Sequence, residues 1–189
     1  DRILDFAYEA LYNKTQRYNL DYLHFATAPY DRKTKQVLDI PQFNLQNLEA
    51  GDFNRILNFD ATSLLYTLDS SAWTGLYRRS FLQKYAINFG THPVQFELFF
   101  FWSTITHELR AAISRDCLIL HDFSEPKLPE GKKAFDLFKK HLEALDILRV
   151  SLSERNVPED LVTIALSQSI RPCIDASWHA ALNEVDAPE

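Results

Sequence analysis

The stretch from Gly90 to Cys117 reads Gly-Thr-His-Pro-Val-Gln-Phe-Glu-Leu-Phe-Phe-Phe-Trp-Ser-Thr-Ile-Thr-His-Glu-Leu-Arg-Ala-Ala-Ile-Ser-Arg-Asp-Cys. Gly90 can end a preceding helix, and Thr91 followed by Pro93 suits the start of a new one, where no proline N–H is needed. Apolar residues then recur every three or four positions, at Val94, Leu98, Phe101, Ile105, Leu109 and Ala112. This spacing predicts a long helix with an apolar face that the fold buries.

The predicted helix is apolar on nearly every side, because Phe99, Phe100 and Trp102 fill much of its remaining circumference. Such a helix lies inside a domain and has neighbours on several sides. The sequence therefore predicts an all-α fold, an irregular bundle of about six to eight helices around a buried central helix from Pro93 to Cys117.

Amphipathic stretches on both sides supply the remaining helices. They are expected over residues 1–13, 15–26, 71–89 and 132–151, and over a final stretch that begins after Asn156. Residues 27–43 read as a long exposed connection, in which 36–40 is the only candidate strand. The chain is expected to form a single helical domain over residues 1–189. The alternative is an N-terminal lobe 1–59 and a main lobe 60–189, joined through the long loop 27–43.

Composition and charge exclude several classes of protein. The chain has 189 residues, of which 46% are apolar, and a formal net charge of −6. A sizeable core can form, whereas nucleic-acid binding is disfavoured because it needs a dense basic surface. No apolar run approaches the roughly 18 residues of a membrane span. We therefore expect a cytoplasmic protein with no membrane span of its own.

Two residue types are used unusually. The two cysteines, Cys117 and Cys173, have no metal-ligand spacing and fit buried free thiols in a reducing compartment. Methionine is absent and apolar periodicity is already under way at Ile3, which suggests that an N-terminal segment or the methionines are missing from the sequence. No signal peptide is recognisable at the start.

Catalytic signatures are missing from the sequence. It contains no nucleophile elbow, no Walker loop, no dinucleotide fingerprint and no zinc-protease motif. We therefore assign no catalytic residue, no cofactor and no metal ligand, and expect a protein that is not an enzyme.

The second half of the predicted central helix is polar and supplies candidate partner contacts, namely Glu108, Arg110 and Arg115. Arginine is favoured at interfaces because its planar guanidinium makes paired hydrogen bonds. The alternative is a helix that simply emerges from the core and pairs its charges locally. Arg110 is expected to pair with a carboxylate from a neighbouring helix or to stand partly exposed as a partner contact.

The aromatic residues allow a second function. Phe96, Phe99, Phe100 and Trp102 could line an apolar pocket of a helical sensor or regulator that binds a small molecule. Aromatic residues at helical spacing more often simply pack in a core.

The run from Leu76 to Asp116 resembles part of a bacterial family of unknown function that is associated with V/A-type ATPases and is similar to a central-stalk component of these rotary ATPases. The matching features are a tyrosine-rich helix from Tyr77 to Tyr85 and a following helix with Phe100-Phe101-Trp102, then Leu109-Arg110 and Arg115. Leu145-Asp146-Ile147-Leu148-Arg149 resembles the family's closing pair of helices. The resemblance implies a non-catalytic interaction subunit, a stalk or coupling component whose partners are protein subunits of a larger assembly. It also implies a place at the periphery of a membrane complex, so that the protein would reach the membrane only indirectly.

Overall fold

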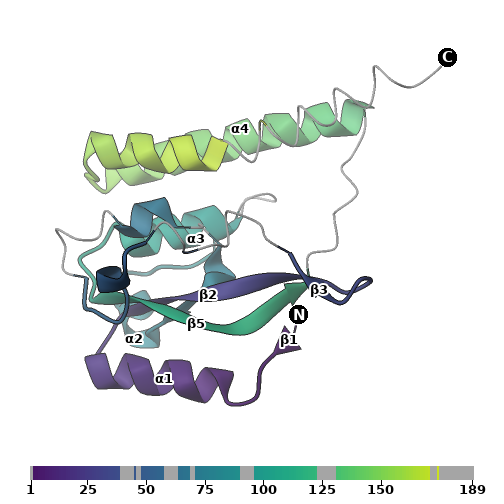
Figure 1. The fold of residues 1–189 in the computed structure, drawn as a ribbon. Coiled ribbons are helices and arrows are strands. Elements are labelled where there is room, and N and C mark those ends of the chain that lie inside the picture. The colour runs from purple at the N-terminus through teal and green to yellow at the C-terminus, as the bar shows by residue number, and fades with distance from the viewer. Residues whose placement is uncertain are drawn as a thin grey trace. The chain divides into compact units, whose positions relative to one another are not determined.

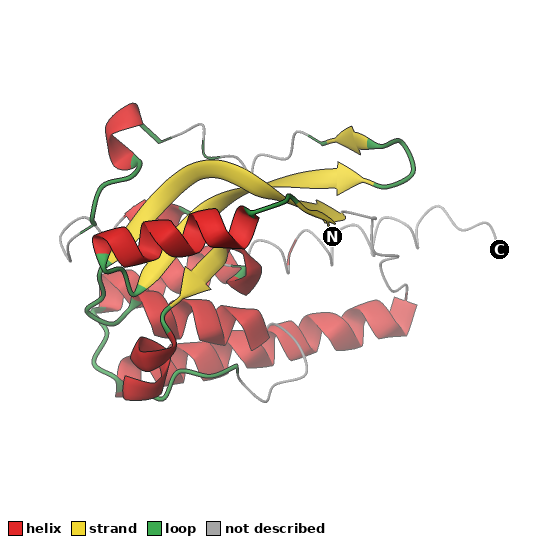
Figure 2. Ribbon diagram, turned by 90° about the horizontal axis from the view of Figure 1, so that it is seen from below, coloured by secondary structure: helices red, strands yellow, loops and turns green. Residues whose placement is uncertain are grey.

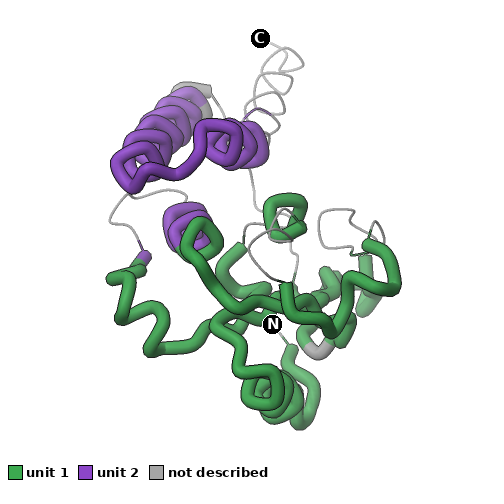
Figure 3. Tube along the Cα trace, turned by 90° about the vertical axis from the view of Figure 1, so that its left-hand side faces the viewer, with its two compact units in different colours: residues 1–88, 104–125 green, residues 89–103, 126–189 purple. Residues whose placement is uncertain are grey.

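The structure of the chain is a computed structural model, and it describes residues 2–38, 45, 48–57, 64–68, 71–89, 96–122, 131–170 and 174. It forms two compact units. Unit 1 comprises Asp1–Asn88 and Thr104–Glu125, and unit 2 comprises Phe89–Ser103 and Pro126–Glu189 (Figure 3). Unit 1 thus includes residues from both sides of the lobe boundary predicted at 59.

Unit 1 is built on a mixed β-sheet. Its elements are β1 (Arg2–Ile3), α1 (Ala7–Tyr18), β2 (Tyr22–Asp31), β3 (Gln36–Val37), β4 (Gly75–Tyr77), α2 (Arg79–Lys84) and β5 (Ala111–Asp122). The described strands form one five-stranded sheet in the order β1-β5-β2-β3, with β4 also paired to β2. The central strands β2 and β5 run parallel, and the other pairs are antiparallel (Figure 1, Figure 2).

The prediction of an all-α bundle is therefore wrong. The predicted central helix corresponds to α3 (Phe96–Ile105) followed by β5, so that its second half is a strand. The misreading has a physical cause. Ala111, Ala112 and Ile113 form a continuous apolar run, and all three are buried because a strand beside a parallel neighbour is covered on both faces. Such a run fits a buried helix as well as a buried strand.

The first 26 residues also differ from the two helices predicted there. A single helix, α1, ends where Asn19 adopts a left-handed conformation with φ of 50°, and its N–H donates to the carbonyls of Gln16 and Thr15. Asparagine is one of the few residues that takes this conformation at low cost. The chain then turns into β2, which occupies the second predicted helix and the start of the predicted loop 27–43. The strand predicted over 36–40 is confirmed at Gln36–Val37 by β3.

Helix α1 lies across one face of the sheet, as Figure 2 shows from the α1 side, and a core cluster of unit 1 joins the two. The buried members of this cluster are Leu11, Leu20, Leu23, Phe25, Ala112 and Ile119. Leu23 and Phe25 alternate along β2 with Tyr22 and His24, whose side chains therefore belong to the opposite face. There Tyr22 stacks on Tyr77 at 4.9 Å between ring centroids, and its hydroxyl lies 2.9 Å from His24 Nδ1.

Unit 2 is helical in its described part. The predicted helix 132–151 is confirmed by α4 (Gly131–Glu154), and residues 159–170 form a further helix. Trp102 is fully buried and donates its indole N–H to Ser169 Oγ at 3.2 Å, which joins α3 to the last described helix. The apolar spacing predicts core positions here at Leu98, Phe101, Trp102, Phe138 and Leu145; Phe101, Trp102 and Leu145 are buried, whereas Leu98 and Phe138 are partly buried. The sequence also predicts a kink or a break at Pro172, because proline removes a helical hydrogen bond, but this position lies outside the described residues.

Candidate functional site

A large bulge interrupts the central strand β5. Phe25 on β2 pairs with Ser114, but Thr27 pairs with Ile119, so that one residue of β2 faces residues 115–118 of β5. Arg115, Asp116 and Cys117 are exposed there. Bulges of this kind redirect side chains and are frequent beside functional sites. The bulge is therefore the first candidate region for chemistry.

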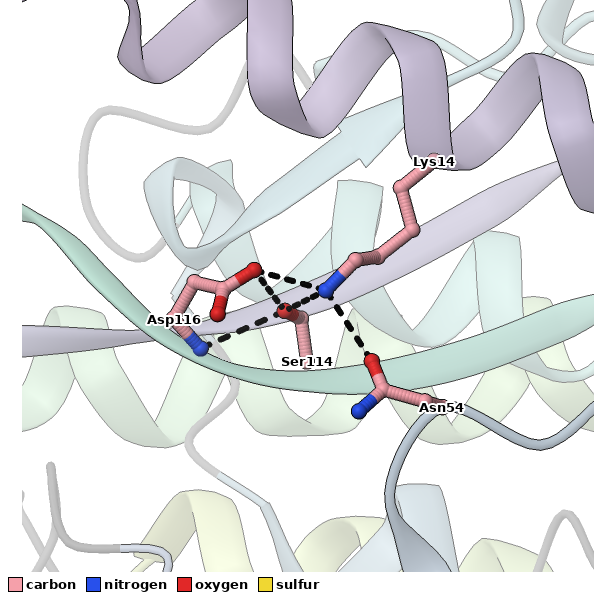
Figure 4. Close-up of polar contacts among 4 residues, drawn as sticks. All are labelled: Lys14, Asn54, Ser114 and Asp116. Carbon is pink, nitrogen blue, oxygen red and sulfur yellow. Dashed lines mark hydrogen bonds and ion pairs between the residues drawn. The ribbon is translucent and has the colours of Figure 1, made fainter.

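A four-residue polar cluster holds the bulge in place (Figure 4). The Lys14 ammonium, on α1, donates to Asp116 Oδ2 at 2.6 Å, to Ser114 Oγ at 2.8 Å and to Asn54 Oδ1 at 3.0 Å. Ser114 Oγ donates to Asp116 Oδ2 at 3.0 Å. The Lys14 hydrogen bond lowers the pKa of Asp116, and the Ser114 hydroxyl adds to this effect against the opposing effect of burial.

A lysine beside a serine is also the arrangement of some nucleophilic enzymes, which need an unprotonated amine and an accessible hydroxyl. Here the three N–H groups of the ammonium each have an acceptor, and the nearest acceptor is a carboxylate. Ser114 is fully buried. The cluster therefore acts as a brace that ties α1 and the Asn54 segment to β5, and it does not present a nucleophile.

The brace makes a stability prediction. Replacing Lys14 with Ala should lower the free energy of unfolding by about 1–2 kcal/mol, because charge-assisted hydrogen bonds are lost at a half-exposed site where water replaces them in part. Urea unfolding of Lys14→Ala, Asp116→Ala and the double variant measures the coupling, which should exceed about 0.5 kcal/mol. Additive single effects would show that the cluster does not act as a unit. Arg149→Ala, which removes an ion pair between two exposed side chains, should change little.

The predicted partner-contact residues fall in different places. Glu108 and Arg110 lie between α3 and β5, outside any helix, and both are exposed. Arg110 Nε donates to the Tyr18 carbonyl at 3.0 Å. Its guanidinium therefore contacts a backbone oxygen, whereas the first expectation was a carboxylate from a neighbouring helix. Arg115 lies on the β5 bulge, with its guanidinium 4.1 Å from the centroid of the Phe53 ring. Contact of these residues with a partner stays a prediction.

The predicted pocket residues lie on α3. Phe99, Phe100 and Trp102 are buried, and Phe100 stacks on Phe89 with 4.3 Å between centroids. The side chain of Phe96 lies outside the described residues. These rings take part in packing within unit 2, and a ligand role for them stays a prediction.

The start of the chain carries a surface that the sequence did not reveal. Ile3 and Tyr8 fit the apolar periodicity of a first buried helix, together with Ala7 and Leu11, yet only the last two are buried. The exposed residues, called here the N-terminal apolar surface, are Ile3 (47% exposed), Leu4 (41%), Phe6 (80%), Tyr8 (54%) and Tyr12 (57%). Phe6 has φ of 61° and ψ of 8°, in the left-handed region.

Three further observations limit what the described residues can do. No group of three or more His, Cys, Asp or Glu side chains among them is placed to hold a metal ion. None of the helices described here combines the length and the apolar composition of a membrane span. Cys117 was expected to be buried, but it is exposed, and its thiol pKa is raised by partial desolvation. A raised pKa disfavours the reactive thiolate.

Comparison with known proteins gives no assignment, since neither a protein-family model nor a curated protein matches the chain. The residues that carried the resemblance to a rotary-ATPase stalk family lie partly outside helices. Leu76 and Tyr77 belong to β4, Leu109 and Arg110 precede β5, and Arg115 is on that strand.

Proposed function

We propose that this protein is a non-catalytic interaction domain that docks another protein through its N-terminal apolar surface. The observation that carries the proposal is Phe6, a large aromatic side chain that is 80% exposed and held in a left-handed backbone conformation.

Both properties of Phe6 are unfavourable for folding. The left-handed conformation costs an ordinary L-residue about 1–2 kcal/mol, and Asn or Gly adopts it more readily. A phenyl ring in water also forgoes the roughly 2 kcal/mol that its burial would contribute. A partner that covers the ring recovers the free energy of burying it, and aromatic side chains are the usual anchors of protein interfaces.

The other exposed apolar residues among the first twelve contribute further area to this surface. Tyr8 and Tyr12 lie one helical turn apart on α1, and each exposes more than half of its area. Tyrosine combines an apolar ring with a hydroxyl that tolerates water, which suits a surface that is wet in the free protein and covered in a complex. Ile3 and Leu4 add aliphatic area before the helix begins. A role as a rotary-ATPase stalk component would be a narrower case of this function and stays a prediction.

The proposal predicts that the variant Phe6→Asn separates stability from binding. Because Asn relieves the backbone strain, the free energy of unfolding should stay unchanged or rise by up to about 1 kcal/mol. Association with a partner captured from the source cells and then purified should weaken at least about tenfold, as for a lost interface anchor. Urea unfolding and titration calorimetry measure the two quantities.

Val37→Asn is the matched control, because Val37 is 60% exposed and lies away from this surface, on β3. Its affinity for the partner should equal that of the wild type. Clear destabilisation of Phe6→Asn with unchanged affinity would instead make Phe6 a structural residue and would refute the proposal.

A further inference from the structure

The topology of unit 1 gathers basic residues at one edge of its sheet. β2 begins at Tyr22 opposite Ala111, where the parallel strand β5 begins, and antiparallel β4 ends at Tyr77 beside Tyr22. The residues just outside the three strands are therefore neighbours. The Asp21 N–H donates to the Arg110 carbonyl at 2.7 Å, and the Arg78 N–H donates to the Asp21 carbonyl at 2.8 Å. This edge lies at the left of Figure 1, where α1 ends.

The residues at this edge and their direct neighbours in the chain carry a surplus of positive charge. We call basic edge the five cationic side chains Arg17, Arg78, Arg79, Lys84 and Arg110. Among the residues that the structure describes, the carboxylates beside them are Asp21 and Glu108, which both raise the pKa of Lys84 after the larger effect of Tyr85. The formal surplus is three positive charges, in a chain whose net charge is −6. The charge at this edge is therefore opposite in sign to the net charge of the chain.

Most of these cations are not neutralised within the described structure. Asp21 pairs with Arg78 at 3.2 Å, and Arg78 also donates to Asn19 Oδ1 and the Leu20 carbonyl. Arg110 uses only its Nε, toward the Tyr18 carbonyl, and Arg79 is exposed without an ion pair among the residues described. Two guanidinium groups thus retain N–H groups in the fork geometry that binds a carboxylate with two hydrogen bonds.

We infer that the basic edge binds an acidic segment of a protein partner. The aromatic rings at this edge favour a protein over a single-stranded nucleic acid. Tyr85 stacks on His107 with 4.2 Å between centroids, and the Lys84 ammonium lies 4.5 Å over the Tyr85 ring. These ring faces already have partners, whereas nucleic-acid binding relies on bases stacking on open faces. A short acidic segment also avoids the acidic remainder of the surface, which repels a long polyanion.

Binding at the basic edge is independent of the N-terminal apolar surface and has its own test. Fluorescence anisotropy with a labelled peptide of glutamates, about ten residues long, should show saturable binding that weakens at least about tenfold between roughly 50 and 300 mM salt. The double variant Arg79→Ala/Arg110→Ala should weaken binding at low salt at least about fivefold, since interfacial arginines contribute directly. Phe6→Asn should leave binding of this peptide unchanged, even if the proposed function fails.

The matched control removes two charges at the other end of β2. Arg32 and Lys33 follow β2 in the turn to β3, and both are exposed. The variant Arg32→Ala/Lys33→Ala should keep binding of the glutamate peptide within about twofold of the wild type if location matters and total charge does not. If the double variant shows no thermal unfolding transition and is therefore not folded, Arg79→Ala alone replaces it, because this substitution removes no described hydrogen bond.

Three outcomes would overturn the inference. The first is an absence of peptide binding at low salt. The second is an equal loss of affinity in both double variants, which would indicate diffuse attraction. The third is equal or tighter binding of a labelled oligothymidine of the same length, which would make the partner a nucleic acid.

Discussion

Replacing Trp102 with Ala should lower the free energy of unfolding of unit 2 by about 3–5 kcal/mol, the range for deleting a large buried aromatic side chain. Trp102 is fully buried and packs edge-on against Phe101, with 5.4 Å between centroids. Its indole N–H also donates to Ser169, so the substitution removes both a hydrogen bond and a large volume from between two helices. Urea unfolding followed by circular dichroism measures the loss.

Trp102→Phe is the control for this prediction, because it keeps an aromatic ring and removes the N–H. Trp102→Phe should lower the free energy of unfolding clearly less than Trp102→Ala does, since most of the side-chain volume stays filled. A loss below about 1 kcal/mol for Trp102→Ala would mean that the site is exposed or loosely packed. That result would contradict the burial of Trp102 between the helices of unit 2.

Acidification should destabilise unit 1 through His24. This residue is only 2% exposed, and burial lowers its pKa from 6.5 to about 3. Between these two pH values the unfolded chain binds a proton that the folded chain does not. The free energy of unfolding should therefore be unaffected by His24 above pH 6.5 and fall below it by about 1.4 kcal/mol for each pH unit, until the folded state is itself protonated near pH 3.

The variant His24→Asn isolates this effect, because its amide can occupy the position of Nδ1 and does not titrate. Urea unfolding at several pH values between 7 and 4 should give a flatter profile for the variant than for the wild type. Asp116, whose pKa is lowered by Lys14, contributes mainly at and below its ordinary value of 3.8, and this contribution is common to the wild type and the variant. Identical profiles for the two proteins would show that His24 is not buried as a neutral group.

The spacing of apolar residues predicted the secondary structure correctly where a helix buries one continuous face. The helix α4 was found because its apolar residues recur at helical spacing over many turns, which no strand pattern reproduces. β5 was missed because the strand that pairs with it, β2, lies far away in sequence and leaves no local signal. Ala111 to Ile113 then match a buried helix and a buried strand equally well.

The polar brace and the candidate surfaces could not be predicted from the sequence, because each depends on residues that are distant in the chain or on the exposure of individual side chains. Lys14 meets Asn54 and Ser114 across separations of 40 and 100 residues, so no local motif joins them. Arg110 was singled out from the sequence as a candidate partner contact, but Arg78 and Arg79 come near it only through strand pairing. The exposure of Phe6 left no signal in the sequence, because a single apolar residue within an apolar helical stretch normally indicates burial.

The most direct test of the central claim, that the N-terminal apolar surface contacts another protein, is photo-crosslinking in the source cells. The photoreactive amino acid p-benzoylphenylalanine would be incorporated at Tyr8 in the full chain, and in a parallel experiment at Val37, which is also exposed. If this surface contacts another protein, position 8 should give one discrete covalent adduct of higher mass that contains a second protein, and position 37 should give none. No adduct from position 8, or the same products from both positions, would contradict it.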